Sequence, residues 1–317
     1  MSPTIHILSG GVGPERDIAL VTGESMESAL REQFPVELRI LDEPALPATL
    51  DPAEGLVFPA LHGEFGEDGG LQALLEERGF IYAGSDARAS RLCIQKSRTK
   101  GVAEAAGVGV VPGRRIGSGE LPSAEELIRD LGPDLVVKPD DKGSSVGLYL
   151  VEGREELRRV LDEREPGEWL VEQRIRGREL SVGLLHGKAM GVVELLPTAG
   201  VYDFESKYTP GRTDYRFPAE IEPVLEDRVR SWSETVFTRC GCRDFARADF
   251  MLSSAGEPYF LEINTLPGLT PTSLLPKSAS CRGFSFPELA KELVLPAIRR
   301  FHNAERPKEE RLSENGP

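Results

Sequence analysis

Cysteine is scarce in this sequence, which limits the roles that thiols can have. Its 317 residues include only four cysteines, Cys93, Cys240, Cys242 and Cys281. None of them forms a CxxC pair, and their spacing in so long a chain does not suggest a disulfide framework. Cys240 and Cys242 could form a redox or metal pair, but small residues at the end of a helix fit the flanking pattern better.

The sequence also lacks long apolar runs and an excess of basic residues. No segment approaches a membrane-spanning run, and the first residues contain no basic stretch followed by a long apolar one. The 38 lysines and arginines are outnumbered by 52 aspartates and glutamates, which gives a formal net charge of -14. We therefore expect a cytoplasmic protein that binds neither membranes nor nucleic acid, although local basic pockets for nucleotide phosphates remain compatible with this charge.

The first 30 residues predict a strand, a turn and a helix. Residues 5–8 predict a buried strand, residues 9–14 a glycine-rich turn and residues 17–30 an amphipathic helix. The turn does not match a dinucleotide-binding fingerprint, because Arg16 stands where glycine or alanine is required. A Rossmann dehydrogenase is therefore only a weak alternative. A second predicted strand at residues 55–61 leads into a glycine-rich loop and a helix, which is typical of an α/β domain.

A polar β-hairpin is predicted in the last quarter of the chain. Two short, mostly apolar runs are separated there by the turn Ser-Ser-Ala-Gly-Glu-Pro. If the turn is centred on its Ala-Gly bond, Asp249 lies opposite Glu262 and Arg247 lies opposite Asn264. Side chains two residues apart on a strand share a face, so all four polar groups are expected on one side of the hairpin.

These facing polar groups suit a divalent cation. Two carboxylates directly opposite each other repel, and a bound cation removes that repulsion. Mg²⁺ typically takes one or two carboxylates plus phosphate oxygens, so Asp249, Glu262 and Asn264 are its predicted ligands. Zinc is a poor candidate because the set contains neither sulfur nor histidine. The alternative is a solvated strand face with chance acidic residues; the adjacent Arg247 and the Pro-Gly turn that follows favour the metal site.

A glycine- and serine-rich loop follows the predicted strand at residues 135–138. It joins Lys138 to a further strand, residues 148–151, and can offer backbone N–H groups to phosphates while Lys138 supplies a positive charge. It is not a Walker loop, since no Gly-Lys-Ser/Thr follows and the next element is a strand. Taken alone, the loop is equally compatible with a plain hairpin turn. The strand at residues 169–175 ends in a polar hinge typical of adenine binding, and Glu179 follows at a distance suited to ribose hydroxyls.

Six motifs in order along the chain resemble those of D-alanine–D-alanine ligases of the ATP-grasp superfamily. The resemblance runs from about residue 5 to about residue 298. The motifs are residues 10–11 with 15–20, 60–63 with 66–69, 138 with 143–147, 202–208, 247–249 and 262–274. Any one of them could arise by chance, but six in order are hard to obtain that way.

The resemblance implies an α/β (α+β) fold with the three-domain ATP-grasp architecture. A Rossmann-like parallel-sheet domain at residues 1–88 would bind substrate. Two antiparallel-sheet subdomains, at residues 89–175 and 176–302, would hold ATP between them, with the metal site in the second. Residues 303–317 would form a flexible tail, and the same analogy implies a homodimer.

The implied activity is the ATP-dependent ligation of two D-alanine molecules for peptidoglycan precursor synthesis. One D-alanine carboxylate takes the γ-phosphoryl group of ATP to give an acyl phosphate, and the amine of a second D-alanine then displaces phosphate. The implied cofactors are ATP and two Mg²⁺ ions, with Mn²⁺ as a substitute. The implied partners are small-molecule amino-acid substrates.

The resemblance also assigns a role to each residue of the predicted site. The catalytic residues are Glu15, Ser144, Tyr208, Arg247 and Gly268. The residues that bind the amino-acid substrates are His62, Lys207, Ser273 and Leu274. The residues that bind ATP are Lys96, Lys138, Ser145, Glu172, Gln173, Ile175 and Glu179, and the metal ligands are Asp249, Glu262 and Asn264.

Within this set the resemblance gives several residues a specific task. Glu15 would bind the ammonium of the first substrate in a hydrogen-bonded set with Ser144 and Tyr208. Arg247 and the backbone N–H of Gly268 would stabilise the oxyanion of the tetrahedral intermediate. Residues 201–218, rich in glycine, proline and aromatics, would form a lid that excludes water. His62 either lies at the first substrate or merely buttresses the glycine loop.

Four positions depart from the family pattern. Gln95 replaces an aspartate, Leu269 a methionine, Ala246 a glycine, and Arg174 an aromatic residue near adenine. These changes bear on the adenine wall and the first-substrate pocket. Two alternatives stay open: a ligase for another amino-acid or hydroxy-acid pair, with Tyr208 speaking against D-lactate as second substrate, and a non-catalytic nucleotide-binding homologue.

Overall fold

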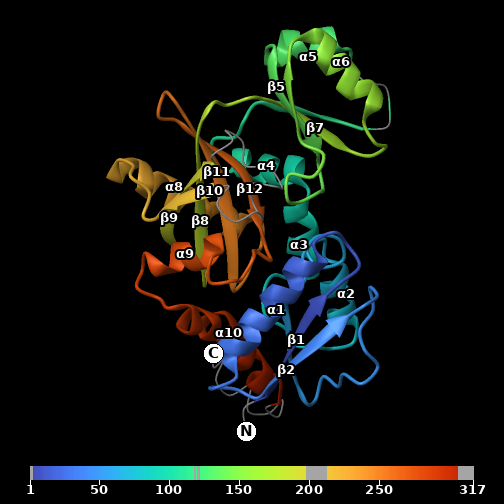
Figure 1. Ribbon diagram of the computed structural model, residues 1–317, viewed down its shortest axis with the longest axis vertical. Helices are drawn as coiled ribbons and strands as arrows, with labels where there is room; N and C mark the ends of the chain where they lie inside the picture. Colours follow the sequence, from blue (N-terminus) through green and yellow to red (C-terminus); the bar gives the residue numbers. More distant parts are fainter. Residues whose placement is uncertain (1–2, 118, 120–121, 198–212, 306–317) are drawn as a thin grey trace, which may run out of the picture.

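The computed structural model describes residues 3–117, 119, 122–197 and 213–305. Its described residues form a three-stranded, a four-stranded and a five-stranded β-sheet, which Figure 1 shows along the long axis of the molecule. The three-stranded sheet lies at one end, the four-stranded sheet at the other, and the five-stranded sheet between them. This arrangement confirms the mixed α/β fold that the sequence predicts.

The three-stranded sheet is parallel, and its strands β1 and β3 are buried whereas β2 is largely exposed or half-buried. Its strands are β1 (Thr4–Gly10), β2 (Val36–Leu41) and β3 (Gly55–Pro59), in the order β2-β1-β3. The two helices next to it in the chain are α1 (Arg16–Leu30) and α2 (Gly70–Glu77). Near-continuous apolar strands such as β1 are typical of sheets covered on both sides. Ile5 and Ile7 pack with α1 on one face, whereas Leu8 packs with α2 on the other.

The last described helix, α10 (Phe286–Glu305), returns to this first sheet (Figure 1). Leu289, Leu293, Ala297 and Phe301 recur every four residues, so they form one apolar face that packs against β1, β3 and α1. Burial of a large apolar side chain contributes about 1.5–3 kcal/mol. The unit that begins the chain therefore depends for its core on residues from the end of the described chain.

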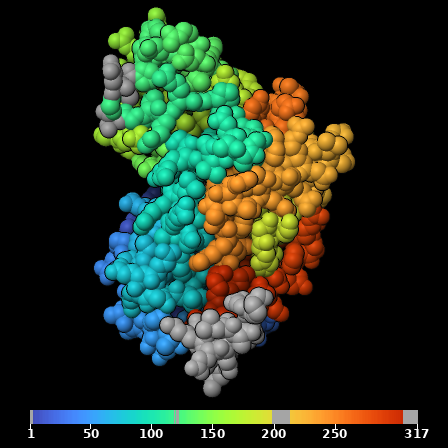
Figure 2. Space-filling model, turned by 180° about the vertical axis from the view of Figure 1, so that it is seen from behind, coloured from blue at the N-terminus to red at the C-terminus, as the bar shows by residue number. Residues whose placement is uncertain are grey.

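Two helices connect the first sheet to the rest of the molecule. They are α3 (Ala87–Ile94) and α4 (Lys96–Ala105), and both contact β12 (Pro258–Asn264). Asp86 begins α3 with its side chain accepting from the N–H of Ala89, as expected for an N-cap. Figure 2, seen from behind, shows this cyan and teal segment lying against the orange segment that includes β12.

The four-stranded sheet is antiparallel, and two helices pack on one of its faces. Its strands are β4 (Gly113–Ile116), β5 (Asp134–Pro139), β6 (Tyr149–Glu152) and β7 (Trp169–Gln173), in the order β4-β7-β5-β6. Its helices are α5 (Ala124–Leu131) and α6 (Arg154–Glu163). Side chains alternate along a strand, so Leu135 and Val137 pack under the helices while Val136 and Lys138 face a cavity.

The five-stranded sheet is also antiparallel, with the order β10-β9-β8-β11-β12. Its other strands are β8 (Gly177–Leu185), β9 (Lys188–Pro197), β10 (Thr213–Arg216) and β11 (Phe245–Ser253). Two further helices, α8 (Pro223–Arg239) and α9 (Leu274–Ser280), pack on it. Along β11, Ala246, Ala248 and Phe250 face the core, so Arg247 and Asp249 project from the opposite face.

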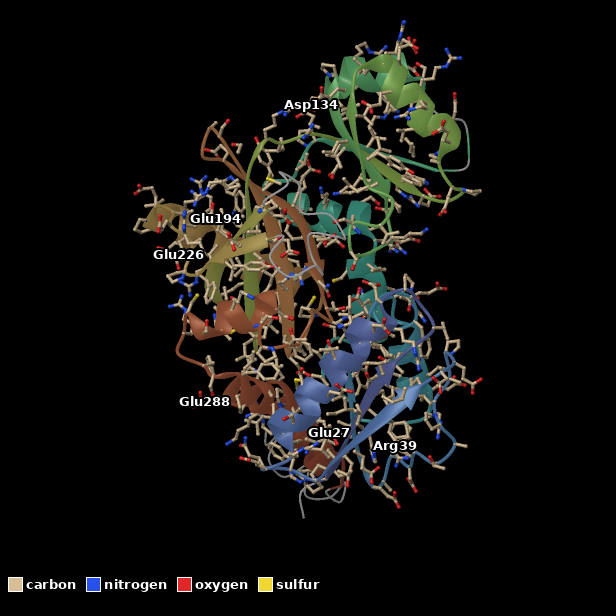
Figure 3. All side chains as sticks on the ribbon, viewed as in Figure 1. Glu27, Arg39, Asp134, Glu194, Glu226 and Glu288 are labelled. Carbon is tan, nitrogen blue, oxygen red and sulfur yellow. The ribbon has the colours of Figure 1, made fainter. Side chains whose placement is uncertain are left out.

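An ion cluster around the buried Glu194 of β9 links it to β8 and to strand β10 at the edge of this sheet. Glu194, labelled in Figure 3, accepts hydrogen bonds from Arg178 Nε at 2.6 Å and Arg178 Nη2 at 2.8 Å. Arg216 of β10 approaches the same carboxylate at 3.3 Å. Hydrogen bonding to Arg178 keeps the pKa of Glu194 below its ordinary value, against the effect of burial.

No helix within the described ranges is long and apolar enough to cross a membrane.

Candidate functional site

The β11–β12 hairpin confirms the predicted pairing of its polar residues. Arg247 lies opposite Asn264, and Asp249 lies opposite Glu262. The outer half of the hairpin differs from the uniform register that the sequence suggests, because an irregularity after Asp249 shifts the pairing by one residue. Such a bulge inserts an extra residue into one strand and turns its side chains.

The extra residue in β12 is Leu261. As a result Phe260 and Ile263, three residues apart, are both buried in the core under the sheet. Leu261 and Glu262 consequently both line the cavity on the other face. The bulge thus places an apolar residue and a carboxylate side by side toward the ligand space.

Two cations lie next to the facing carboxylates. Arg247 forms a two-point ion pair with Asp249, with Nε–Oδ1 at 3.0 Å and Nη2–Oδ2 at 2.8 Å. Lys96 Nζ lies 3.4 Å from Glu262 Oε2. Ser181 Oγ also donates to Asp249 Oδ1 at 2.6 Å. The repulsion expected between the opposed carboxylates is therefore offset by protein cations in this structure.

The donor set nevertheless fits Mg²⁺. Asp249, Glu262 and Asn264 supply carboxylate and amide oxygens, which are hard ligands, and Mg²⁺ needs only one or two protein carboxylates beside phosphate oxygens. Asn264 Oδ1 accepts from the N–H of Leu266 at 2.9 Å, which fixes the orientation of the amide. No cluster of three or more His, Cys, Asp or Glu side chains suited to a metal occurs in the described part of the chain. A metal at this hairpin would thus depend on phosphate oxygens for part of its coordination.

A cavity of about 430 Å³ lies between the four-stranded and five-stranded sheets. All residues predicted to bind ATP line it, together with two of the predicted metal ligands. They are Lys96, Lys138, Ser145, Glu172, Gln173, Ile175 and Glu179, with Asp249 and Glu262. Apolar walls come from Val136, Leu195 and Met251. We call this space the nucleotide cavity.

A buried charge cluster beside the nucleotide cavity includes a residue that sequence reasoning missed. Glu172, 2% exposed, pairs with Lys138 Nζ at 2.8 Å and with Lys100. Burial lowers the pKa of Lys100 to about 8, although Glu172 acts in the opposite direction. For Lys138 burial also opposes the charged form, but Glu172 outweighs it and raises the pKa. The two lysines together overcome the burial of Glu172 and lower the pKa of that carboxyl.

Arg174, one of the four positions that depart from the family pattern, lies in the hinge after β7. Its guanidinium lies 3.5 Å from Asp134 Oδ1 and 3.3 Å from Glu152 Oε1, and the side chain lines the nucleotide cavity. Asp134, labelled in Figure 3, belongs to the four-stranded sheet. The arginine is thus held at the cavity rim from the four-stranded sheet.

The glycine- and serine-rich loop between β5 and β6 links the nucleotide cavity to a second one. Ser144 and Ser145 have φ of 51° and 57°, the left-handed conformation that non-glycine residues rarely adopt. Ser144 Oγ donates a hydrogen bond to Glu15 of the first unit. Two adjacent left-handed serines therefore bring the loop across to the parallel-sheet unit, as the resemblance implies for Glu15 and Ser144.

The second cavity, of about 710 Å³, lies where the first unit meets the five-stranded sheet. We call it the amino-acid cavity. It shares Lys96, Gly143, Ser144, Glu262 and Leu274 with the nucleotide cavity, so the two spaces adjoin. The remaining predicted residues that line it are Glu15, His62, Arg247, Asn264, Gly268 and Ser273.

Part of the wall of the amino-acid cavity is built around Glu15 and His62. Glu15 is 7% exposed and lies just before α1. Gly63 has a φ of +69°, which strains any other residue, and a Cβ there would come within 2.2 Å of Glu15 Oε2 and displace that carboxylate. His62 is held on both nitrogens, with Thr22 Oγ1 at 3.1 Å from Nε2 and Glu67 Oε1 at 3.3 Å from Nδ1. His62 thus faces the cavity and supports the loop at once.

Another part of the cavity wall is formed by the turn before α9 and the start of that helix. Ser273 Oγ lies 2.8 Å from Thr270 Oγ1 and accepts from the N–H of Thr270 at 3.1 Å. Gly268, Ser273, Leu274 and Lys277 all line the cavity here. Lys207, Tyr208 and most of the predicted lid lie outside the described residues.

Sequence reasoning missed three residues near the two cavities, and the sequence indicates them to different degrees. Lys100 lies one helical turn after Lys96, on the same face of α4, so helical spacing alone could have indicated it. Ser181 has no such signal, because it meets Asp249 only through the pairing of β8 with β11. Lys277 likewise reaches the cavity only because α9 docks against the five-stranded sheet.

Comparisons with known proteins agree with this geometry. The family model for the D-ala D-ala ligase C-terminus matches residues 102–295. A D-alanine–D-alanine ligase of Anaeromyxobacter sp. (strain Fw109-5) is 38% identical over 92% of this chain and 95% of its own length. One from Desulforudis audaxviator (strain MP104C) is 37% identical, covering 92% and 97%.

Solved structures give the same result for the fold. The crystal structure of D-alanine–D-alanine ligase from Bacillus anthracis complexed with ATP has a TM-score of 0.84 and 28% identity, covering 96% of this chain and all of that one. A second crystal structure of that enzyme has a TM-score of 0.81. With a matching family model over most of the chain and relatives that align along nearly all of it, this protein belongs to the D-alanine–D-alanine ligase family.

Proposed function

We propose that this protein joins two D-alanine molecules into D-alanyl-D-alanine with ATP, for peptidoglycan precursor synthesis. The observation that carries this proposal is the junction of the two cavities at Lys96, Ser144 and Glu262. A γ-phosphoryl group in one space can there meet a carboxylate in the other. A bimolecular transfer gains most from holding the reacting groups in contact.

In the first step the carboxylate of one D-alanine attacks the γ-phosphorus of ATP, and ADP leaves. Glu15, held by Ser144, binds the ammonium of that substrate and so directs its carboxylate toward the junction. Lys96 and Lys138 balance the charge of the phosphates. When bound, Mg²⁺ or Mn²⁺, held by Asp249, Glu262 and Asn264, supplies further charge neutralisation.

In the second step the amine of another D-alanine attacks the acyl phosphate carbonyl. The C–N bond forms, the amine gives up a proton, and the C–O bond to phosphate breaks. Arg247 and the backbone N–H of Gly268 stabilise the oxyanion of the tetrahedral intermediate. Both line the amino-acid cavity, on the side of the hairpin that carries Asn264.

The nucleotide is gripped at three points in this proposal. Glu172, Gln173 and Ile175 bind adenine at the hinge after β7. Glu179 binds the ribose hydroxyls, and Ser145 contributes to the phosphate loop. Each side chain lines the nucleotide cavity, which supports the assignment.

The second substrate and the closed state complete the proposal. Ser273, the Leu274 amide and Lys207 receive the carboxylate of the second D-alanine, and His62 lies beside the first. Tyr208 joins the Glu15–Ser144 pair when residues 201–218 close over the site. The family resemblance also supports a homodimer in the cytoplasm, which light scattering and cell fractionation test directly.

The first experiment measures phosphate release from ATP by the purified protein with Mg²⁺ and D-alanine, with products identified by mass. Parallel reactions contain D-lactate plus D-alanine, D-serine or L-alanine. D-alanyl-D-alanine from D-alanine alone is the expected product. Turnover only with another pair would reassign the substrates, whereas ATP binding without turnover on any of them would favour a non-catalytic homologue.

A further inference from the structure

Three lysine and arginine side chains line the amino-acid cavity, and they differ in whether a carboxylate pairs with them. Lys96 has the carboxylate of Glu262 at 3.4 Å, and Arg247 is paired at two points with Asp249. Lys277 lines the same cavity, yet in the described part of the chain no carboxylate pairs with it. Two of the three cations are thus already neutralised by the protein.

The surroundings of Lys277 hold its ammonium at the cavity wall. Its Nζ lies 4.3 Å from the ring centroid of Tyr215 and 6.0 Å from that of Phe217. A cation over an aromatic face is attracted to it but keeps its charge. Burial lowers the pKa of Lys277 below its ordinary value, which is the response of a partly desolvated ammonium without an anion. An anionic ligand would relieve that cost.

The position of Lys277 relates it to the predicted carboxylate-binding residues. Its backbone N–H donates to Ser273 O at 3.1 Å, so the two residues are one helical turn apart on the same face of α9. Tyr215 packs with Leu274, Val193 and Leu195, which fixes the ring under the lysine. Lys277 and Ser273 therefore present a cation and a hydroxyl to the same side of the cavity.

The charges of the cavity match two zwitterions placed in sequence. Glu15, just before α1 of the first unit, offers a carboxylate for an ammonium, and Lys277, in α9 on the five-stranded sheet, offers an ammonium for a carboxylate in the same cavity. Resting on the function proposed above, we propose that Lys277 binds the carboxylate of the second D-alanine. The amine of that substrate is then directed away from α9, toward the acyl phosphate formed at the junction of the cavities. Lys277 would thus make the enzyme select nucleophiles that carry a free carboxylate.

The test compares Lys277→Met with the wild type, using D-alanine and D-alaninamide as competing second substrates. D-alaninamide has the amine but no carboxylate, so it can act as nucleophile but cannot be phosphorylated. In the variant we expect the KM for D-alanine in the second step to rise about tenfold, the factor that roughly 1.4 kcal/mol represents. The preference for D-alanine over D-alaninamide should fall by the same factor. The KM for ATP should not change.

Two further variants make the result decisive. Lys188→Met removes a lysine that is 81% exposed and lines neither cavity, so it controls for loss of one positive charge. Lys277→Arg keeps the positive charge. It should retain much of the preference for D-alanine over D-alaninamide, and it provides a second test if Lys277→Met folds poorly. An unchanged second-step KM and preference in a folded Lys277→Met would overturn this inference while leaving the ligase function intact. Failure of the wild type to make D-alanyl-D-alanine would instead overturn the proposed function.

Discussion

The nucleotide cavity and the amino-acid cavity differ in whether their charged side chains are paired with one another. Beside the nucleotide cavity, Glu172 lies between Lys100 and Lys138 in a buried cluster that is internally paired. In the amino-acid cavity, Glu15 and Lys277 come from different elements and are not paired with each other in the described part of the chain. A polyphosphate is bound by several cations whose position is already set, whereas two zwitterions need an acidic and a basic end. The difference indicates that each cavity is organised for the charge pattern of its own ligand.

Glu262→Gln should break both sides of this comparison, because Glu262 lines both cavities. It removes one predicted metal ligand and the anionic partner of Lys96 without changing side-chain size. We expect turnover to fall at least about 100-fold, the low end for losing a group that stabilises transition-state charge. Phosphate release under saturating substrates measures it, with thermal unfolding as the control for folding. Near-normal activity would contradict the metal assignment.

Glu15→Gln should affect the amino-acid cavity alone. The amide keeps the shape that accepts from Ser144 but removes the charge that attracts an ammonium. Hydrogen bonds to charged groups contribute about 1.5–3 kcal/mol, so kcat/KM for the first D-alanine should fall by roughly 10- to 100-fold. Steady-state kinetics against D-alanine at fixed ATP will measure this loss. An equal rise in the KM for ATP would show that the two cavities are not independent.

Lys100→Met should affect the nucleotide side through stability and its pH dependence. The pKa of Lys100 is lowered to about 8 in the folded protein, against 10.5 as the ordinary value. Between these values the unfolded chain binds more protons, so the free energy of unfolding should rise with pH across this window in the wild type. The variant should lack that rise, a difference of the order of 1–3 kcal/mol.

The measurement is urea unfolding of both proteins at several pH values from 7 to 10. Subtracting the two curves cancels titrations that they share. The variant keeps the Lys138–Glu172 pair, so the subtraction isolates the second lysine. A constant difference between the curves would mean that Lys100 does not titrate in this range.

Arg174→Trp should give the smallest effect. The arginine is held at the cavity rim by Asp134 and Glu152, and ion pairs of this partly exposed kind contribute about 0–1 kcal/mol. Replacing it with the aromatic type frequent in the family should change the KM for ATP by less than about fivefold. Titration with an ATP analogue measures the affinity directly. A large loss would assign adenine binding to the arginine itself.

Local patterns in the sequence were enough to predict the hairpin chemistry. Strand periodicity and a central turn placed Asp249 opposite Glu262 and Arg247 opposite Asn264, as the structure has them. The bulge at Leu261 could not be predicted, because it depends on which side chains of β12 find space in the core. The register of the outer hairpin was therefore wrong by one residue, although the polar pairs were right.

The way in which the charges of Asp249 and Glu262 are balanced could not be predicted from the sequence. The repulsion between Asp249 and Glu262 was expected to require a divalent cation. In the structure Lys96, from a helix more than 150 residues earlier in the chain, already lies beside Glu262. No local pattern links these two residues, since only the packing of α4 against β12 brings them together.

The sequence by itself determined the family and the types of its elements, and it was enough to propose most residues of the site, because these features depend on local periodicity and on ordered motifs. Tertiary structure alone decided that the two cavities adjoin, that Lys100 shares Glu172 with Lys138, and that Lys277 meets the amino-acid cavity. The physical reason is that side-chain spacing along a helix or strand fixes which residues share a face. Which faces then meet, and hence which charges remain without a partner, depends on the packing of the whole chain.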